Sequence, residues 1–357
     1  MDRPGALIGA VRSFAQRHFV GRDACVALSG GPDSLALTAA AVRAGLDVEA
    51  LIVDHGLQPQ SARVAATAAL AAEVLGARAR VLPVVVGTAG GLEAAARSAR
   101  YAALDLARDG RPVLLGHTLD DQAETVLLGL ARGSGPASLS GMRGWRPPWG
   151  RPLLALRRSD TVAACAQWGL APVDDPHNGD PRFTRVRVRT QVLPLMDDVL
   201  GGGVAEALAR TADLLDADNR LLDALSAGLA AEAAVGDGLA VDPLVAAPEA
   251  LRSRVLRRWL SAVIDGELPA APVRPPRAGP AQRQAAHVVV EVDVVVVDPH
   301  RLGQLERHLR QLARQHRGQV ALQQVGHALD RVVQRDRGGG IFAVSYTHLT
   351  LPTKRIV

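Results

Sequence analysis

Short apolar runs alternate with helical patterns along the first half of the chain. Four runs are predicted to be buried strands, over 26–28, 48–53, 80–86 and 112–116. Apolar residues at helical spacing predict helices over 1–20, 35–42, 61–75, 92–107 and 119–131. Strands that alternate with helices predict an α/β fold, a doubly wound parallel sheet that binds its ligands at the carboxyl ends of the strands.

The pattern changes after three consecutive glycines, Gly201 to Gly203. Two long leucine-rich helical patterns follow, over 204–232 and 248–264, and predict a small all-helical domain. We therefore expect one domain over 1–202, a second over 203–270, and an unassigned tail over 271–357.

Composition narrows the class of protein. The 357 residues are 48% hydrophobic, which is ample for a core, and the net charge is +5. No run approaches the roughly 20 apolar residues of a membrane span, and the N-terminus carries no signal-peptide pattern. The two cysteines, Cys25 and Cys165, are isolated, which excludes a disulfide framework and a CxxC metal site. We expect a soluble, cytoplasmic protein.

The stretch Ser29-Gly-Gly-Pro-Asp-Ser34 lies between the first strand and its helix. Glycines free backbone N–H groups and a helix N-terminus is positive, so together they bind oxyanions. Ser29 and Ser34 add hydroxyl donors, and Asp33 is suited to hold a Mg²⁺ that bridges phosphates. The lysine of a Walker A loop is missing. SGGPDS instead resembles the SGGxDS PP-loop of ATP pyrophosphatases; the alternative is a plain glycine turn between a core strand and a core helix.

A second polar motif, Gly116-His-Thr-Leu-Asp-Asp-Gln-Ala-Glu-Thr125, follows the fourth strand. His117, Asp121 and Glu124 are spaced four and three apart, so a helix places them on one face. The carboxylates suit a further contact to Mg²⁺ or the capture of a cationic amine. The alternative is an Asp-rich first helical turn that complements the helix dipole, with His117 as a local cap.

Arg97 and Arg100 lie one turn apart on a predicted helix that faces the same sheet edge. They are suited to pair with a phosphate or with an incoming carboxylate. Solvated arginines are the alternative.

Two later segments are rich in arginine. The irregular segment 141–158 interleaves arginines with tryptophans, which is typical of a loop that stacks on bases and contacts phosphates. Arg185, Arg187 and Arg189 alternate, either on one face of an extended segment or scattered around a helix, and a solvated basic face is the alternative.

Taken in order, several motifs resemble the tRNA(Ile)-lysidine synthase family over about residues 20–265: SGGPDS, VDHGLQ, GLEAAARSARY, GHTLDDQAETVLLGLARGSG, RPLL and DPHNGDPRFTRVRVRTQVLP. The resemblance implies ATP and Mg²⁺ as cofactors, with a CAU-anticodon tRNA(Ile) and L-lysine as partners. ATP would adenylate the C2 oxygen of the wobble cytidine and release pyrophosphate, and lysine would then displace AMP to give lysidine. One departure is Val186, where the family commonly has Asn.

The resemblance also implies roles for individual residues. The pyrophosphate would bind to Ser29, Gly30, Gly31, Pro32, Asp33 and Ser34, and Mg²⁺ to Asp33 and Asp121. His117 would lie near the α-phosphate, and Asp121 and Glu124 would orient the lysine amine. Arg97 or Arg100 would pair with phosphate or with the lysine carboxylate. Contacts to RNA would come from Arg151, Arg182, Arg185, Arg187 and Arg189. The catalytic ATP-binding domain would be 1–202 and the helical tRNA-binding domain 203–270, with a homodimer left open and no membrane partner.

The tail over 271–357 differs from the rest of the chain. It carries 13 Lys+Arg against 6 Asp+Glu, whereas the first 270 residues carry 28 against 30. The only lysine, Lys354, lies in a stretch that looks like appended adapter-derived sequence. Our leading interpretation is a frameshifted or chimeric gene end, and the alternative is a divergent basic extension that binds tRNA. The apolar run 288–297 has no evident partner strand, and we assign the tail no function.

Two other functions remain open from the sequence. One is another PP-loop enzyme, which thiolates cytidine or uridine in tRNA, although Cys25 and Cys165 cannot supply a CxxC pair. The other is a protein that binds RNA or nucleotide without catalysis.

Overall fold

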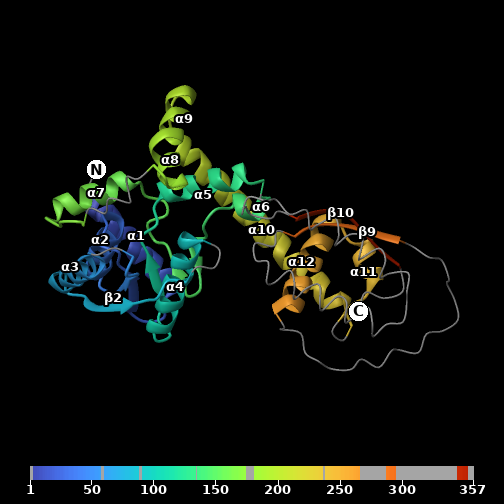
Figure 1. Cartoon of the computed structure of the whole chain (residues 1–357), viewed down its shortest axis with the longest axis horizontal. Coiled ribbons are helices and arrows are strands. Elements are labelled where there is room, and N and C mark those ends of the chain that lie inside the picture. The colour runs from blue at the N-terminus through green and yellow to red at the C-terminus, as the bar shows by residue number, and fades with distance from the viewer. Residues whose placement is uncertain are drawn as a thin grey trace. The chain divides into compact units, whose positions relative to one another are not determined.

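The computed structural model describes residues 3–57, 60–87, 91–133, 135–173, 181–235, 238–265, 287–294 and 344–352 (Figure 1). Two compact units make up the chain, Met1–Asn219 and Arg220–Val357. No helix among these residues is both long enough and apolar enough to cross a membrane.

A six-stranded sheet forms the centre of the first unit, in the order β3-β2-β1-β4-β6-β5. The parallel strands are β1 (Asp23–Ala27), β2 (Asp47–Asp54), β3 (Arg78–Pro83), β4 (Val113–Leu115) and β6 (Trp149–Gly150), and β5 (Trp145–Arg146) is antiparallel to β6. The predicted α/β fold with a mostly parallel sheet is confirmed. The third strand begins two residues earlier than predicted and ends at Pro83, which has no N–H to donate to a ladder.

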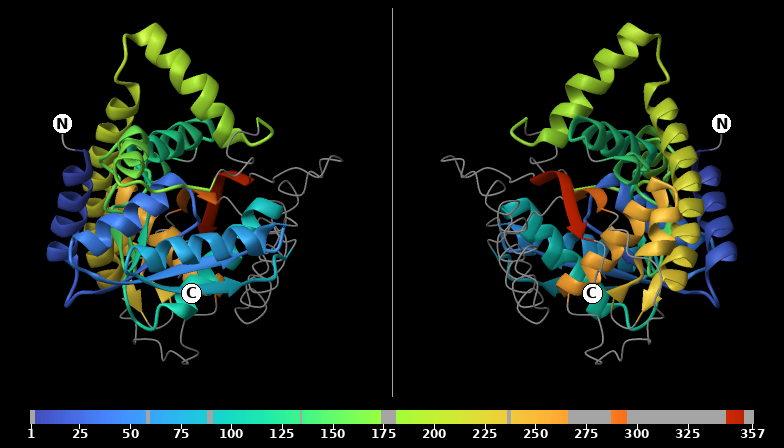
Figure 2. Two further views of the ribbon diagram at one scale, coloured as in Figure 1. Left: turned by 90° about the vertical axis from the view of Figure 1, so that its left-hand side faces the viewer. Right: turned by 90° about the vertical axis from the view of Figure 1, so that its right-hand side faces the viewer.

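Side chains of β1 alternate between two buried faces of the sheet. On one face Ala24, Val26 and Leu28 share a core with the helices α1 (Arg3–His18), α2 (Pro32–Arg43), α3 (Ser61–Val74) and α7 (Arg158–Gln167). On the other face Cys25 and Ala27 pack with α4 (Leu92–Ala107). Figure 2 shows α3 running across β2 and β3. Because both faces are covered, the strand is a continuous apolar run rather than an alternating one.

The segment 141–158, predicted to be irregular, contributes β5 and β6 to the sheet. Strands of two residues are too short to give a periodic signal. The ring of Trp145 lies 5.9 Å from that of Phe14, and Trp149 lies 4.8 Å from Tyr101 between centroids. The tryptophans thus pack against the protein's own aromatic rings, which does not support the base-stacking role expected of this segment.

The helix α5 (Leu119–Ala131) has the predicted bounds and follows β4 after three residues. It packs with a helical run made of α8 (Thr184–Arg187), the π-helical turn η2 (Val188–Val192) and α9 (Leu193–Leu200), and with the start of α10 (Val204–Ala233). The alternating arginines of 185–189 therefore lie on a helix and not on an extended segment.

Three glycines, Gly201 to Gly203, join α9 to α10, and all three have positive φ, a conformation that other residues rarely adopt. The predicted domain boundary falls at this link, whereas the first compact unit continues along α10 to Asn219. The predicted domain limits therefore stay a prediction.

The second unit contains the remainder of α10, the hairpin of β7 (Ala234–Val235) and β8 (Gly238–Leu239), α11 (Val241–Ala246) and α12 (Glu249–Asp265). A small core joins these elements: Ala233, Leu239, Leu244, Val255 and Leu256. In the tail, β9 (His287–Val294) pairs antiparallel with β10 (Val344–Pro352). The expectation that the apolar run at 288–297 lacks a partner strand was wrong; the rest of the tail lies outside the described residues.

Candidate active site

The loop Ser29–Ser34 connects β1 to α2 at the carboxyl end of the sheet. Gly30 has φ +86°, and a Cβ atom there would lie 3.3 Å from a Val173 methyl group, so the position favours glycine. The hydroxyl of Ser34 accepts a hydrogen bond from the Ser29 N–H at 3.1 Å and donates to the Gly31 carbonyl at 3.1 Å. Pro32 is the first residue of α2, and no side chain caps the helix at Gly31. The geometry is that of a closed turn leading into a helix N-terminus, as anion binding requires.

Close backbone packing brings the second polar motif beside this loop. A Cβ atom on Gly116, just after β4, would lie 3.0 Å from the carbonyl carbon and oxygen of Asp33. Glycine lets β4 end this close to the start of α2 without displacing the backbone of Asp33. The two motifs, more than 80 residues apart in sequence, therefore meet at one edge of the sheet.

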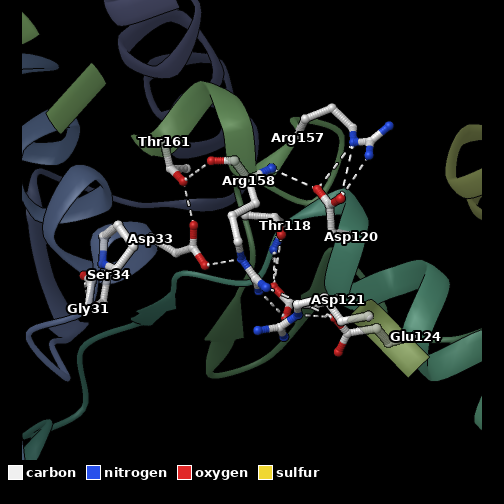
Figure 3. Close-up of polar contacts among 12 residues, drawn as sticks. Gly31, Asp33, Ser34, Thr118, Asp120, Asp121, Glu124, Arg157, Arg158 and Thr161 are labelled. Atoms are coloured by element: carbon white, nitrogen blue, oxygen red, sulfur yellow. Dashed lines mark hydrogen bonds and ion pairs between the residues drawn. The ribbon is translucent and has the colours of Figure 1, made fainter. Parts of the chain in front are cut away.

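Asp33 and Asp121 face the same guanidinium group, that of Arg158 on α7 (Figure 3). Arg158 Nε donates to Asp33 Oδ2 at 2.9 Å, and Nη2 donates to Asp121 Oδ1 at 2.7 Å. The hydroxyl of Thr161, one turn along α7, donates to the other oxygen of Asp33. The structure thus brings together the two predicted Mg²⁺ ligands, with a cationic side chain between them.

The environments of the two aspartates differ. Burial raises the pKa of Asp33 above its ordinary value, although Arg158 opposes the rise. Burial acts in the same direction on Asp121, but Arg158 and the hydrogen bonds from Thr118 outweigh it, so the pKa of Asp121 is lowered. Thr118 donates both its N–H and its hydroxyl to Asp121 Oδ2, at 2.8 and 2.9 Å. Asp121 therefore completes the capping box of α5 through one oxygen and contacts Arg158 through the other.

Glu124 is fully buried, one turn further along α5. Its Oε1 accepts a hydrogen bond of 2.6 Å from Arg189, and Arg185 Nη1 lies 3.9 Å from its Oε2. Among the described residues no group donates a hydrogen bond to Oε2. Burial raises the pKa of Glu124 and Arg189 opposes the rise. A buried acceptor without a donor is costly, so this oxygen is suited to a ligand that carries N–H groups.

Two of the arginines predicted to contact RNA, Arg185 and Arg189, lie beside Glu124. Arg185 and Arg189 are four residues apart on a helical run, which places both on one face, whereas Arg187 between them is exposed. Arg182 is also exposed. The alternating spacing therefore does not put the three arginines on one RNA-facing surface, as an extended segment would.

A third predicted RNA contact, Arg151, holds His117. Arg151 Nε donates to His117 Nδ1 at 3.2 Å. An arginine has only donors, so Nδ1 must be the unprotonated nitrogen and Nε2 the N–H donor of the neutral ring. Burial, followed by the charge of Arg151, lowers the pKa of His117 from 6.5 to about 3. His117 is thus a neutral hydrogen-bond donor.

The predicted pair on α4 lies on this side of the site. The guanidinium of Arg97 lies 5.0 Å from the centre of the Tyr101 ring. Arg97 and Arg100 both help to lower the pKa of His117, and Arg100 acts in the same way on His55, after burial. His55, which follows β2, has a buried Nδ1 without a hydrogen-bond partner among the described residues.

Sequence reasoning missed Arg158 and Thr161 as site residues. The sequence signal for Arg158 was weak: two adjacent arginines at the start of a helical pattern, after the RPLL stretch. Its partners lie 125 and 37 residues away in the chain. Only the fold shows that α7 points its first turn at the phosphate loop.

The fold and this loop define a class of protein. Residues 9–196 match the family model of the PP-loop domain, which makes the first unit an ATP-binding domain of that class. In sequence the chain is 63% identical over 254 residues to the tRNA(Ile)-lysidine synthase of Nocardia farcinica, covering 70% of this chain and 80% of that protein. The enzyme of the same name from Mycobacterium tuberculosis is 60% identical over 274 residues, with 73% and 83% covered.

The chain belongs to the tRNA(Ile)-lysidine synthase family. Membership makes it an ATP-dependent ligase of tRNA modification, as the motifs predicted. Among solved structures, a U34-tRNA thiolase from Methanococcus maripaludis with its [4Fe-4S] cluster is 15% identical, with a TM-score of 0.47, covering 59% of this chain and 79% of that one. A likeness at this level carries no argument about the chain's activity.

Proposed function

We propose that this chain joins L-lysine to C2 of the wobble cytidine in a CAU-anticodon tRNA(Ile). In the first step the C2 oxygen attacks the α-phosphorus of ATP, and the bond to the β-phosphate breaks to release pyrophosphate. In the second step the lysine ε-nitrogen attacks C2, and the C–O bond breaks as AMP leaves with the electron pair. Family membership and the site on the PP-loop support this reaction.

The loop Ser29–Ser34 binds the pyrophosphate part of ATP in this proposal. Its glycine turn and the uncapped start of α2 offer N–H groups to phosphate oxygens. His117 donates from Nε2 to charge that develops at the α-phosphate. A neutral donor serves here because it stabilises the added charge without a prior change in its own protonation. Arg97 and Arg100 supply positive charge on the same side of the site.

The aspartates Asp33 and Asp121 fit a Mg²⁺ ion. Mg²⁺ takes oxygen ligands, often one or two carboxylates together with substrate phosphates. Phosphate oxygens of the nucleotide and water molecules would supply the other ligands. When bound, the ion would neutralise charge on the phosphates.

Glu124 is the group best suited to receive the lysine amine. Its unpartnered Oε2 accepts a hydrogen bond from the amine, and its raised pKa makes it a stronger base than an exposed carboxylate. The amine loses a proton as the C–N bond forms, and Glu124 takes it. Asp121 orients the same amine from one turn away.

The observation that carries this proposal is the meeting of Asp33 and Asp121 at one guanidinium. It supports the proposal that the PP-loop and the second motif form one site, as a two-step ligase requires. A glycine turn with an unrelated acidic helix start would not bring these carboxylates together.

The test is incorporation of labelled lysine into an unmodified CAU-anticodon tRNA(Ile) transcript, with ATP and Mg²⁺. We expect Asp33→Asn and Asp121→Asn each to lower the rate by about a hundredfold or more, since each removes a charge from the reacting site. Asp23→Asn is the matched control, because Asp23 is an exposed aspartate at the opposite end of β1. Equal rates in all four proteins would overturn the site assignment, and no label even with wild type would overturn the reaction.

Neither alternative function gains support from the site. The two cysteines are buried, and burial raises the pKa of each thiol to about 11, which disfavours the thiolate that sulfur transfer or cluster binding needs. A protein that only binds RNA has no need of two carboxylates beside a phosphate loop. We further propose a cytoplasmic location, where tRNA and ATP are available, and leave a homodimer as a prediction for sedimentation.

A further inference from the structure

The guanidinium group of Arg158 lies close to three carboxylates. It contacts Asp33 from the phosphate loop and Asp121 from α5, and its Nη1 lies 4.0 Å from Glu124 Oε1 (Figure 3). These are the carboxylates to which the proposed function assigns the metal ion and the lysine amine. Without a cation between them, Asp33 and Asp121 would repel each other, and Asp121 indeed contributes to the raised pKa of Asp33.

The guanidinium of Arg158 is not fully satisfied by these partners. Its Nη1 is buried and has no hydrogen-bond acceptor among the described residues. A buried guanidinium N–H without an acceptor is unfavourable, so an oxygen from a ligand would improve the contacts of this group. Phosphate oxygens suit it best, since arginine binds phosphate in the same planar geometry as carboxylate.

From these contacts we propose that Arg158 is a displaceable counter-cation, which occupies the Asp33–Asp121 pair in the nucleotide-free enzyme and excludes a divalent ion until phosphates arrive. The inference rests on the proposed function of this pair as the metal site. ATP brings negative charge that attracts the guanidinium, and the two carboxylates become available to the ion that accompanies the nucleotide. Metal binding thereby depends on nucleotide binding, and Arg158 acts as a positioning residue.

The charges of the site favour a mechanism in which a divalent ion replaces Arg158 at the two aspartates over one in which the ion binds beside Arg158. Asp121 and Glu124 already face Arg158 and Arg189 directly, and Arg185 lies 3.9 Å from Glu124. The carboxylates of the site are therefore neutralised by arginines, and an added divalent ion would meet cationic groups at short range. Like charges at such distances in a partly buried site repel strongly.

The neighbouring residue provides a matched control. Arg157 occupies the N-cap position of the same helix, but donates to Asp120 at 2.9 Å and to Glu206 at 2.6 Å. Its ion pairs within the described part of the chain are with Asp120 and Glu206, and none is with Asp33 or Asp121. Removing either arginine changes the net charge by the same amount, so only the position differs.

The test is the affinity of the full chain for Mn²⁺, read by the electron paramagnetic resonance of the free ion, without tRNA or lysine. We expect weak binding to the wild type alone and tight binding with α,β-methylene-ATP. Arg158→Met should bind Mn²⁺ without nucleotide about tenfold more tightly than the wild type, since a competing charge pair is gone. Arg157→Met should match the wild type, and Asp33→Asn added to Arg158→Met should abolish the gain.

Equal Mn²⁺ affinity in Arg158→Met and wild type would overturn the proposal, and so would an equal gain in Arg157→Met. Thermal unfolding reports whether each variant folds. If Arg158→Met does not fold, Arg158→Lys replaces it. A single ammonium group cannot bridge both carboxylates, so this variant should show a smaller gain in Mn²⁺ affinity. An unchanged Mn²⁺ affinity would count against the proposal. Lysine incorporation is a separate measurement. If the enzyme incorporated no lysine, the proposed function would be overturned, but the Mn²⁺ affinities would still decide whether Arg158 competes with a divalent ion.

Discussion

His117 shows how burial and one hydrogen bond together set the protonation state of a residue. An isolated histidine titrates near neutral pH, but here burial and Arg151 keep the ring neutral. A variant that loses Arg151 would lose both the tautomer and part of the pKa shift. Arg151, which we expected to contact RNA, thus also fixes the tautomer of His117.

We predict that His117 makes the stability of the fold depend on pH. The pKa of His117 is about 3 in the folded protein and 6.5 in the unfolded chain. Between pH 3 and 6.5 the unfolded chain therefore binds more protons than the folded protein. The contribution of His117 to the free energy of unfolding is complete above pH 6.5 and is lost as the pH falls below it. The contribution lost at pH 5 is roughly 1–2 kcal/mol. Urea unfolding at pH 7.5 and pH 5 should show a smaller acid loss for His117→Gln than for wild type.

Arg151→Met provides a second variant for this measurement. Without the arginine's charge the pKa of His117 rises toward its ordinary value, so the acid loss of stability should shrink as well. An acid loss equal in wild type and both variants would mean that His117 is not held neutral in the fold.

At the scale of single residues, the sequence identified those that belong to a contiguous motif. Asp33, His117, Asp121 and Glu124 were all predicted, and the structure places their motifs at one sheet edge. Arg158 was not, because its contacts are with residues 125 and 37 positions away in the chain, which no local pattern encodes. For Arg185 and Arg189 the spacing left an extended segment and a helix both open, and the structure places them on a helix.

At the scale of elements, the junction of β4 with α2 decides whether the two motifs meet. We predict that Gly116→Ala destabilises the protein by roughly 1–3 kcal/mol, since the added methyl group meets the backbone of Asp33, which cannot yield as a flexible side chain would. The nucleotide affinity should fall too, because the loop must shift. Calorimetric titration with α,β-methylene-ATP and thermal unfolding would measure both.

The control for this substitution is Gly9→Ala. Gly9 lies within α1, and no atom lies within 4 Å of its added Cβ. Alanine there should stabilise the fold by about 0.5–1 kcal/mol through helix propensity and leave nucleotide affinity unchanged. If Gly116→Ala behaved like Gly9→Ala, the close approach of the two motifs would be disproved.

The elements themselves were largely predictable, and for a physical reason. Buried strands of a parallel sheet are apolar on both faces, so they stand out as runs, and α5 and α10 have strong helical periodicity. The short strands β5 and β6 were missed, because two residues have no period. The pairing of β9 with β10 was missed because the two strands are 49 residues apart.

At the scale of the whole molecule, the net charge of +5 comes from the tail, which contains 13 Lys+Arg and only 6 Asp+Glu. If the tail has no function, a chain that ends at residue 270 should incorporate lysine as the full chain does. A plot of the logarithm of its tRNA affinity against the logarithm of the salt concentration should have the same slope as for the full chain. Each phosphate contact that is lost would reduce the magnitude of that slope by about one. A slope lower by several, together with lost incorporation, would show instead that the basic tail binds tRNA.

The double role of Asp121 has a consequence for the thermodynamics of ligand binding. Because Thr118 fixes one oxygen of the carboxylate as the cap of α5, the side chain is already confined to one rotamer before any ligand arrives. Immobilising a free side chain on binding costs about 0.5–1.5 kcal/mol in conformational entropy. At Asp121 that cost has been met during folding, so the hydrogen bonds that begin the helix also hold the carboxylate in place for any ligand that it binds.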